Sequence, residues 1–303
     1  MSAAAPNRRL VILCLAAVYV IWGSTYLAMR VAVEGLPPFF MASTRFILTG
    51  SILLAFLKFR GASWPTRREW LMALPVGVLM FVAGNGTVAV AEQHLSSGVA
   101  AVVCGTMPLC VAALSRFFGE KVTPREWIAL VIGFTGVALL SMGKELRAEP
   151  MAALILFVAP VAWALGSLLA RKLPLAKGLM SAATQMLTGG VVMGFVSFIA
   201  GEKAPVDPPM RSVAAWVYLA VFGSLVAYSA YSWLLSNTRA AVATSYSYVN
   251  PAIAVAMGVG MGGESAGPEV FAAVALIIVA TVLVMTRPKP QPEPSASLSP
   301  TTD

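Results

Sequence analysis

The chain has 303 residues, of which 58% are hydrophobic and only 11% charged, and its formal net charge is +8. In a soluble domain roughly a quarter of the residues are charged. This composition therefore excludes a water-facing globular domain and indicates a protein embedded in a bilayer. The basic residues are scattered between apolar stretches and form no basic aromatic surface. A nucleic acid is therefore not an expected partner, whereas the lipid bilayer is.

Ten apolar stretches are long enough for membrane-spanning helices, which need about 20 predominantly apolar residues. We predict spans at 10–29, 39–57, 70–91, 97–116, 126–143, 151–170, 180–200, 213–235, 241–262 and 268–286. Barrel strands would be shorter and would alternate in polarity, so the expected fold is an all-α membrane protein. Residues 1–9 are expected to form a cytoplasmic N-terminus, and the Pro- and Ser-rich residues 287–303 a disordered cytoplasmic tail.

The distribution of Lys and Arg predicts the orientation of these spans. With the N-terminus inside, the inside segments hold Arg8, Arg9, Lys58, Arg60, Arg67, Arg68, Arg116, Lys121, Arg125, Arg171, Lys172, Lys177, Arg239, Arg287 and Lys289. The outside segments hold only Arg30, Lys144, Arg147, Lys203 and Arg211. Because short cytoplasmic loops are enriched in Lys and Arg, both termini are predicted to be cytoplasmic.

The two halves of the chain resemble each other at an offset of about 140 residues. The matched pairs are Trp22 with Trp163, Arg30 with Arg171, Leu48-Thr49-Gly50 with Leu187-Thr188-Gly189, Pro108 with Pro251, and Glu126 with Glu269. We therefore predict two five-helix repeats, at residues 10–143 and 151–286. Since an odd number of spans reverses the direction of entry, the second repeat is expected to be inverted, as in many secondary transporters.

Several short motifs carry a family resemblance over residues 10–286. They are Trp22-Gly23-Ser24-Thr25, Arg45-Phe46, Pro108 and Gly119-Glu120 in the first half, and Trp163-Ala164-Leu165-Gly166-Ser167, Asn250-Pro251 and Gly263-Glu264 in the second. In this arrangement the chain resembles the EamA-type carriers of the drug/metabolite transporter superfamily. The resemblance implies a basket of helices around a central cavity in a bacterial inner membrane. It also implies export of amino acids and related metabolites.

Polar and aromatic residues within the spans are the candidates for the wall of a substrate cavity. They are Tyr19, Trp22 and Tyr26 on one face of the first helix, Asn85, Thr106, Trp163, Ser167, Tyr228, Tyr231, Tyr246, Tyr248 and Asn250. Aromatic rings with a polar edge suit an amphipathic cavity. Helix packing is the alternative explanation for the aromatic residues, and hydrogen bonds within the helices are the alternative for Ser and Thr. Pro108 and Pro251 each remove a backbone donor and are candidate hinges.

Arg45 is the only basic residue well inside a predicted span, and its counterpart in the second repeat is Thr184. Its planar guanidinium suits a bidentate clamp for a substrate carboxylate. Alternatively it has a structural role, paired with Glu92, bonded to carbonyls or extended toward the interface. The sequence leaves both roles open.

No metal, cofactor or catalytic group is expected. His94 is the only histidine, and neither a GxxxxGK[ST] nor a GxSxG motif occurs. Glu264 is expected at a helix end, and no pair of carboxylates is expected at mid-membrane depth. We therefore expect a facilitator or an exchanger rather than an enzyme, with proton coupling left open.

The expected function is a secondary transporter that exports small amphipathic metabolites, amino acids by family analogy, through alternating access. The family resemblance, together with the positions of the polar residues, implies a cavity between the first, third, fourth, sixth, eighth and ninth helices. The alternatives are a channel-like facilitator of small polar solutes and an exporter of other metabolites or drugs. Whether the protein is a monomer or a homodimer is left open.

Overall fold

A computed structural model describes residues 8–118, 123–238 and 245–285 of the chain. Within these ranges every regular element is helical, so the predicted all-α class is confirmed. The first half contains α1 (Arg8–Val33), α2 (Pro38–Phe59), α3 (Arg67–Gly77), α4 (Thr87–Ala91), α5 (Ser97–Cys104), α6 (Met107–Ser115) and α7 (Pro124–Ser141). The second half contains α8 (Lys144–Ala148), α9 (Pro150–Ala170), α10 (Leu179–Ile199), α11 (Met210–Tyr218), α12 (Tyr228–Asn237), α14 (Tyr246–Met261) and α15 (Pro268–Met285).

Eight helical stretches of the described chain are long and apolar enough to cross a membrane. They are Arg8–Val33, Pro38–Phe59, Arg67–Ala91, Ser97–Ser115, Pro124–Ser141, Pro150–Ala170, Leu179–Ile199 and Met210–Leu234. Two shorter apolar stretches, Val249–Met261 and Pro268–Leu283, lie in α14 and α15. Each of the eight stretches overlaps a predicted span, whereas the total of ten stays a prediction because the span expected at 241–262 begins outside the described residues.

Two of the long stretches change helix type midway. The π-helical segment η1 (Val78–Gly86) joins α3 to α4, and η3 (Leu219–Ala227) joins α11 to α12. Each segment has 9 residues, and each begins and ends 141 residues from its counterpart, at Val78 and Leu219 and at Gly86 and Ala227. A π-helical turn displaces backbone carbonyls from the ordinary helical hydrogen bonds and occurs often at functional sites.

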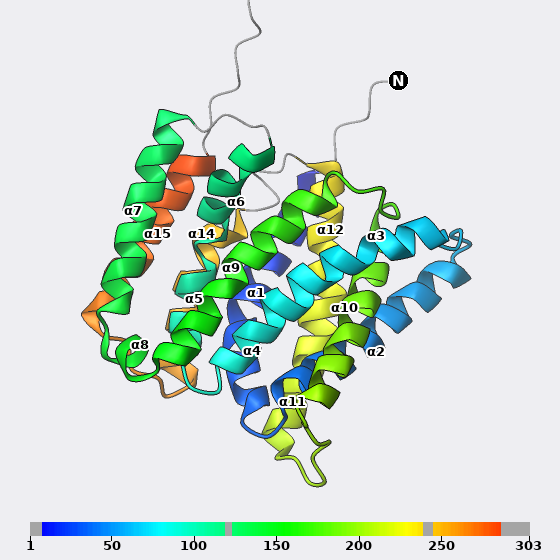
Figure 1. The fold of residues 1–303 in the computed structure, drawn as a ribbon, viewed down its shortest axis with the longest axis horizontal. Helices are drawn as coiled ribbons and strands as arrows, with labels where there is room; N and C mark the ends of the chain where they lie inside the picture. Colours follow the sequence, from blue (N-terminus) through cyan, green and yellow to red (C-terminus); the bar gives the residue numbers. More distant parts are fainter. Residues whose placement is uncertain (1–7, 119–122, 239–244, 286–303) are drawn as a thin grey trace, which may run out of the picture.

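Close helix pairs give the bundle its shape. Figure 1 shows α7 beside α15 at one edge, α2 beside α10 at the other, and α1 and α9 between them. Small residues let the backbones approach, because a Cβ added at Gly50 of α2 would lie 2.8 Å from Leu187 Cγ, and one added at Gly190 of α10 would lie 3.0 Å from Ile47 Cγ1. Such glycine-mediated contacts are typical of helices packed within a bilayer.

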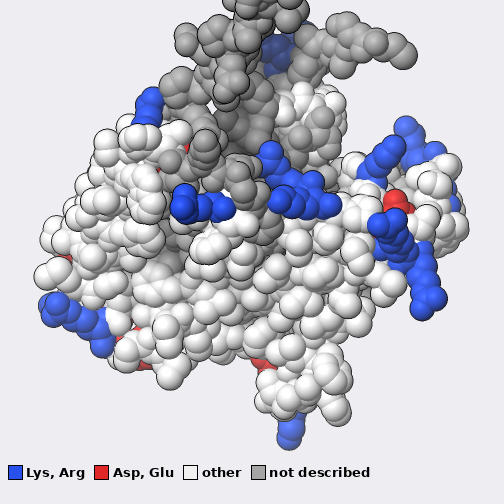
Figure 2. Space-filling model, turned by 45° about the horizontal axis from the view of Figure 1, so that its top comes forward, with Lys and Arg blue, Asp and Glu red and all other residues white. Residues whose placement is uncertain are grey.

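The chain reverses at two opposite ends of the bundle. The lower end, as drawn in Figure 1, carries residues 34–37, 92–96, 200–209 and 262–267, and the upper end carries residues 60–66 and 171–178. α1 starts at the upper end, and α15 finishes there. Figure 2 shows Lys and Arg in a few separate groups, with a largely uncharged surface between them.

Carboxylates fix where several helices begin. Thr66 accepts a hydrogen bond from the backbone N–H of Glu69, and the Glu69 carboxylate accepts one from Thr66, which forms a capping box at α3. Thr123 and Glu126 repeat this arrangement at α7. At the lower end the Glu202 carboxylate accepts hydrogen bonds from the backbone N–H groups of Phe39 and Phe40 and so caps α2 from a distant loop.

Candidate functional site

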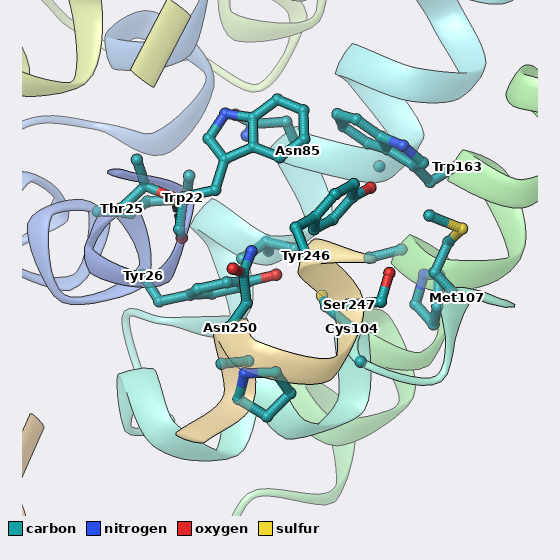
Figure 3. Close-up of a pocket in the computed structure, with 18 residues that line it drawn as sticks. Trp22, Thr25, Tyr26, Asn85, Cys104, Met107, Trp163, Tyr246, Ser247 and Asn250 are labelled. Carbon is teal, nitrogen blue, oxygen red and sulfur yellow. Dashed lines mark hydrogen bonds between the residues drawn. The ribbon is translucent and has the colours of Figure 1, made fainter. Parts of the chain in front are cut away.

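A cavity of about 120 Å³ lies between α1, α4, α5, α6, α9, α14 and η1 (Figure 3). A single water needs only about 15 Å³ on such a measure, so the cavity has room for several waters or for part of a small solute. Seven predicted residues line it: Trp22, Tyr26, Asn85, Trp163, Tyr246, Asn250 and Pro251. Helices far apart in the sequence therefore bring these residues to one place.

Trp22 is at the centre of the aromatic wall. Its ring centroid lies 4.8 Å from that of Tyr246, 5.0 Å from that of Tyr231 and 6.5 Å from that of Trp163. The ring is nearly perpendicular to those of Tyr246 (81°) and Trp163 (84°), an edge-to-face arrangement that aromatic pairs favour. Figure 3 shows Trp22, Trp163 and Tyr246 around the same space. The wall is thus built from aromatic rings packed edge to face, and such rings can pack against the apolar part of a ligand.

The two tryptophans differ in how their indole N–H groups are used. Trp22 Nε1 donates to the carbonyl of Gly223, 3.1 Å away in the π-helical segment η3. Trp163 Nε1 is buried and has no hydrogen-bond acceptor within the described part of the chain. A buried donor without an acceptor is unfavourable, so Trp163, which lines the cavity, carries a hydrogen-bonding group that the described chain leaves unused.

Arg45 lies beside a second, smaller cavity. This chamber of about 50 Å³ shares Trp22, Asn85 and Trp163 with the larger one. The Arg45 side chain is only 3% exposed; its Nη2 donates to Asn85 Oδ1 at 2.6 Å, and its guanidinium carbon lies 4.2 Å from the centroid of the Phe46 ring. Its Nε finds no acceptor among the described residues. Two residues that line the small chamber, Arg45 and Trp163, therefore each carry one buried donor without an acceptor in the described chain.

The pairing of Arg45 with Glu92, one of the structural roles open from the sequence, does not occur. Both carboxylate oxygens of Glu92 are buried and have no hydrogen-bond partner in the described chain, and Arg45 bonds to Asn85 instead. The reason is the position of the two groups, because Asn85 precedes Glu92 by about two helical turns and lies next to the guanidinium. Arg45 is held by a neutral amide rather than by a charge.

The other predicted residues occupy the surroundings of the two cavities. Tyr228 lines the smaller chamber and donates to Gln185 Oε1 at 3.1 Å, and Tyr231 is buried among the aromatic rings. Tyr19 and Ser245 share a 2.5 Å hydrogen bond. Thr106, in the break between α5 and α6, donates to the carbonyl of Val103 in α5, and Ser167 donates to the carbonyl of Trp163 in its own helix; neither residue lines either cavity. The side chain of Tyr248 lies outside the described residues.

The two candidate hinges lie close to the cavity floor. Helices α5 and α6 are interrupted at Gly105 and Thr106, and Pro108 occupies the first turn of α6. Pro251 lies inside α14 and lines the cavity. When its amide is oriented to satisfy its neighbours, Asn250 donates to the carbonyls of Tyr19 and Tyr246, 3.2 Å from each. The proline-containing turn of α14 is thereby tied to α1.

Sequence reasoning missed several residues of the cavity wall. They are Thr25, Met29, Gly84, Val88, Ala101, Cys104, Gly105, Met107, Ala159, Pro160 and Ser247. Thr25 and Ser247 lie next to predicted residues, so their positions gave a usable signal. The remainder are small or apolar residues of a kind found on every face of these helices, so no sequence signal separates them from packing residues.

Comparison with known proteins adds a family and a fold. The profile of the EamA-like transporter family matches residues 9–142 and 150–286. The "Uncharacterized inner membrane transporter YedA" of Escherichia coli K12 is 44% identical over 238 residues, which cover 78% of each chain. A WAT1-related chloroplastic protein of Arabidopsis thaliana is 25% identical, over 76% of this chain and 58% of its own. A solved structure described as "Crystal structure of protein" has a TM-score of 0.65 at 19% identity and covers 91% of this chain and 96% of its own.

Proposed function

The chain belongs to the EamA-like transporter family, and we propose on this basis that it is a secondary transporter that exports small amphipathic metabolites, amino acids among them, by alternating access. The observation that carries the proposal is the cavity between helices of both halves, with an aromatic wall and a buried cation beside it. A concave, mostly apolar site with a few convergent polar groups is typical of small-molecule binding.

Alternating access would follow from two inverted five-helix repeats around the cavity. Equivalent helices of the two halves pair directly, α2 with α10 and α7 with α15. The crossed contacts are also matched, because α1 packs against α14 while α9 packs against α5 and α6. The π-helical segments η1 and η3 have the same length and corresponding positions. Inverted repeats allow one bundle to rock against the other around a fixed site.

The cavity chemistry supports a substrate that carries a carboxylate. Arg45 and Trp163 both line the small chamber, and neither Arg45 Nε nor Trp163 Nε1 has an acceptor among the described residues. No acidic side chain of the described chain lines either cavity. A carboxylate oxygen would satisfy both donors and compensate the buried charge, since guanidinium–carboxylate hydrogen bonds are strong. The apolar part of such a substrate would rest on Trp22 and Tyr246.

We further propose an inner-membrane location with both termini in the cytoplasm. The relative from Escherichia coli is named as an inner membrane transporter. The described Lys and Arg residues are more numerous at the upper end, where α1 starts and α15 finishes, than at the lower end. An excess of basic residues marks the cytoplasmic side of a membrane protein.

Counterflow in proteoliposomes tests the proposal. Vesicles preloaded with unlabelled solute receive the same solute with a label, across a panel of amino acids, purines and polyamines. A carrier accumulates labelled solute above equilibrium and its uptake saturates, whereas a channel-like facilitator does neither. Accumulation of labelled purines or polyamines alone, without amino acids, would favour an exporter of other metabolites. Arg45→Lys keeps the charge but loses the planar guanidinium. This variant should bind carboxylate substrates more weakly, by about tenfold or more. Full transport by this variant would exclude a bidentate clamp at Arg45.

A further inference from the structure

Glu92, which follows the last residue of α4, is the most completely buried acid of the described chain. Its side chain is 0% exposed, and neither carboxylate oxygen has a hydrogen-bond partner among the described residues. Arg30 Nη1 donates at 2.5 Å to the backbone carbonyl of Glu92 and not to its carboxylate. No basic group of the described chain lies within ion-pair distance of this carboxylate. The group is therefore shielded from bulk solvent and has no bonded counter-charge in the described chain.

The groups around Glu92 come from three other elements. α1 contributes Arg30 and Tyr26, α5 contributes Cys104, and the segment between α14 and α15 contributes Glu264. The Glu264 carboxylate accepts hydrogen bonds from the backbone N–H and the hydroxyl of Ser97, each 2.9 Å long. Burial raises the pKa of Glu92 well above its ordinary value, and the charge of Glu264 adds to this effect while Arg30 opposes it. The protonated acid is thus the favoured form in this arrangement.

The buried acid lies about one helical turn beyond the cavity wall, toward the lower end. Val88 lines the cavity, and Glu92 follows it by one helical turn. Met29 also lines the cavity and directly precedes Arg30. On α5, Ala101 lines the cavity one helical turn after Ser97. The backbone N–H of Ser97 donates a hydrogen bond to the Glu264 carboxylate. Any separation of α1, α4 and α5 that opened the cavity at this end would also admit water to Glu92.

We propose that Glu92 is a proton-binding site whose proton is released when the lower end opens. The carboxyl O–H stays intact while α1, α5 and the segment 262–267 pack around it. When they separate, the proton passes to water, and the carboxylate keeps the electron pair and becomes hydrated. If the protein is a transporter as proposed, each opening of this end releases one proton; this consequence rests on the proposed function. Proton binding itself does not depend on which solute is carried.

The direction of the pH effect follows from linkage. The carboxyl group holds its proton more tightly in the closed state than in the hydrated open state, where the ordinary pKa of about 4.3 applies. Between these two pKa values opening releases a proton, so the opening equilibrium shifts toward the open state by up to tenfold for each unit of pH increase. Below the ordinary pKa both states are protonated, and the dependence disappears.

Infrared spectroscopy of the full chain in bilayers tests the site without any substrate. Wild type near pH 7 should show a C=O stretching band of a protonated carboxylic acid, and Glu92→Gln should lack this band. Glu145→Gln is the matched control at the same end, because the Glu145 carboxylate is already hydrogen-bonded to the backbone and hydroxyl of Ser96. This control should keep the band. Absence of the band from wild type, or its survival in Glu92→Gln, would overturn the proposal.

Thermal unfolding in detergent provides a second readout that needs no transport. Because the buried acid holds its proton more tightly than the same residue in the unfolded chain, the melting temperature of wild type should fall as the pH rises from about 5 to 9. Glu92→Gln, which mimics the neutral acid, should lose this part of the fall. If counterflow fails for every solute while the band and this pH dependence persist, the proposed function is wrong and the proton site stands. Equal pH dependence in both proteins would contradict the proton site.

Discussion

Gly105 and Pro251 meet at the floor of the cavity, where a Cβ added to Gly105 would lie 2.8 Å from Pro251 Cγ. This distance is shorter than real Cβ contacts, so only glycine permits the interruption between α5 and α6 to rest on the proline-containing turn of α14. The interruption between α5 and α6 in the first half therefore lies directly against the ring of Pro251, the candidate hinge of the second half. A movement of one helix interruption must displace the other, because closely packed cores deform little.

Gly105→Ala should push the break between α5 and α6 away from α14, because the new Cβ would clash with the ring of Pro251. Overpacking at such a contact costs about 1–3 kcal/mol of unfolding free energy, and thermal unfolding in detergent measures the loss. Gly260→Ala is the control in α14 itself, because a Cβ added there meets nothing within 4 Å. It should leave the stability unchanged or raise it by up to about 1 kcal/mol, since alanine favours the helix. Equal stabilities of the two variants would show that the floor can relax without cost.

Trp22→Phe and Trp163→Phe should differ in their effects: the first should lower the stability, and the second should lower the affinity for substrate. Trp22 loses its hydrogen bond to Gly223, so its replacement should cost about 0.5–1.5 kcal/mol. Trp163→Phe breaks no hydrogen bond within the described chain and should leave the stability nearly unchanged. If the free indole N–H binds the substrate carboxylate, the same variant should lose affinity by roughly tenfold. Unchanged affinity in Trp163→Phe would remove this donor from the site.

Asn85→Ala should release Arg45. The hydrogen bond from Arg45 Nη2 to Asn85 Oδ1 involves a charged donor, and its loss in a buried setting should cost about 1.5–3 kcal/mol of unfolding free energy. The matched control is Asn237→Ala, because the exposed amide of Asn237 only donates to the carbonyl of Trp233 in its own helix. The control should change the stability by less than about 0.5 kcal/mol. If both variants lose the same unfolding free energy, the hydrogen bond from Arg45 to Asn85 does not contribute measurably to stability.

The positions of the helices were predictable because bilayer thickness and apolar length act locally. The span predicted at 39–57 is Pro38–Phe59 in the structure, with Pro38 at the start, where proline is tolerated. The π-helical segment Val78–Gly86 was not predictable, because apolar residues and single glycines such as Gly84 and Gly86 also occur in ordinary membrane helices. The break at Gly105 has the same origin, since single glycines are common inside membrane helices.

The site was predictable only where a side chain is chemically distinctive. Trp22 and Trp163 stand out in a chain of small apolar residues, and both line the cavity. Ser167 and Thr106 were indistinguishable from cavity residues, because a hydroxyl that bonds within its own helix has the same sequence signature as one that faces a solute. Glu92 directly follows the span predicted at 70–91, but its complete burial depends on α1, α5 and the segment 262–267, which meet only in three dimensions.

The proposed orientation predicts where each end of the bundle faces in a living cell. A reporter that is active only in the cytoplasm, fused after Met285, should be active, and the same reporter inserted between Ala200 and Met210 at the lower end should be silent. Insertion between Gly61 and Thr66, at the upper end, is the matched internal control and should be active. The physical reason is that the upper end carries Lys58, Arg60, Arg67 and Arg68 on the α2–α3 connection alone, and such clusters are retained in the cytoplasm. Opposite results for the fusion and the 61–66 insertion would place the two on different sides of the membrane, and the inverted-repeat arrangement would be lost with them.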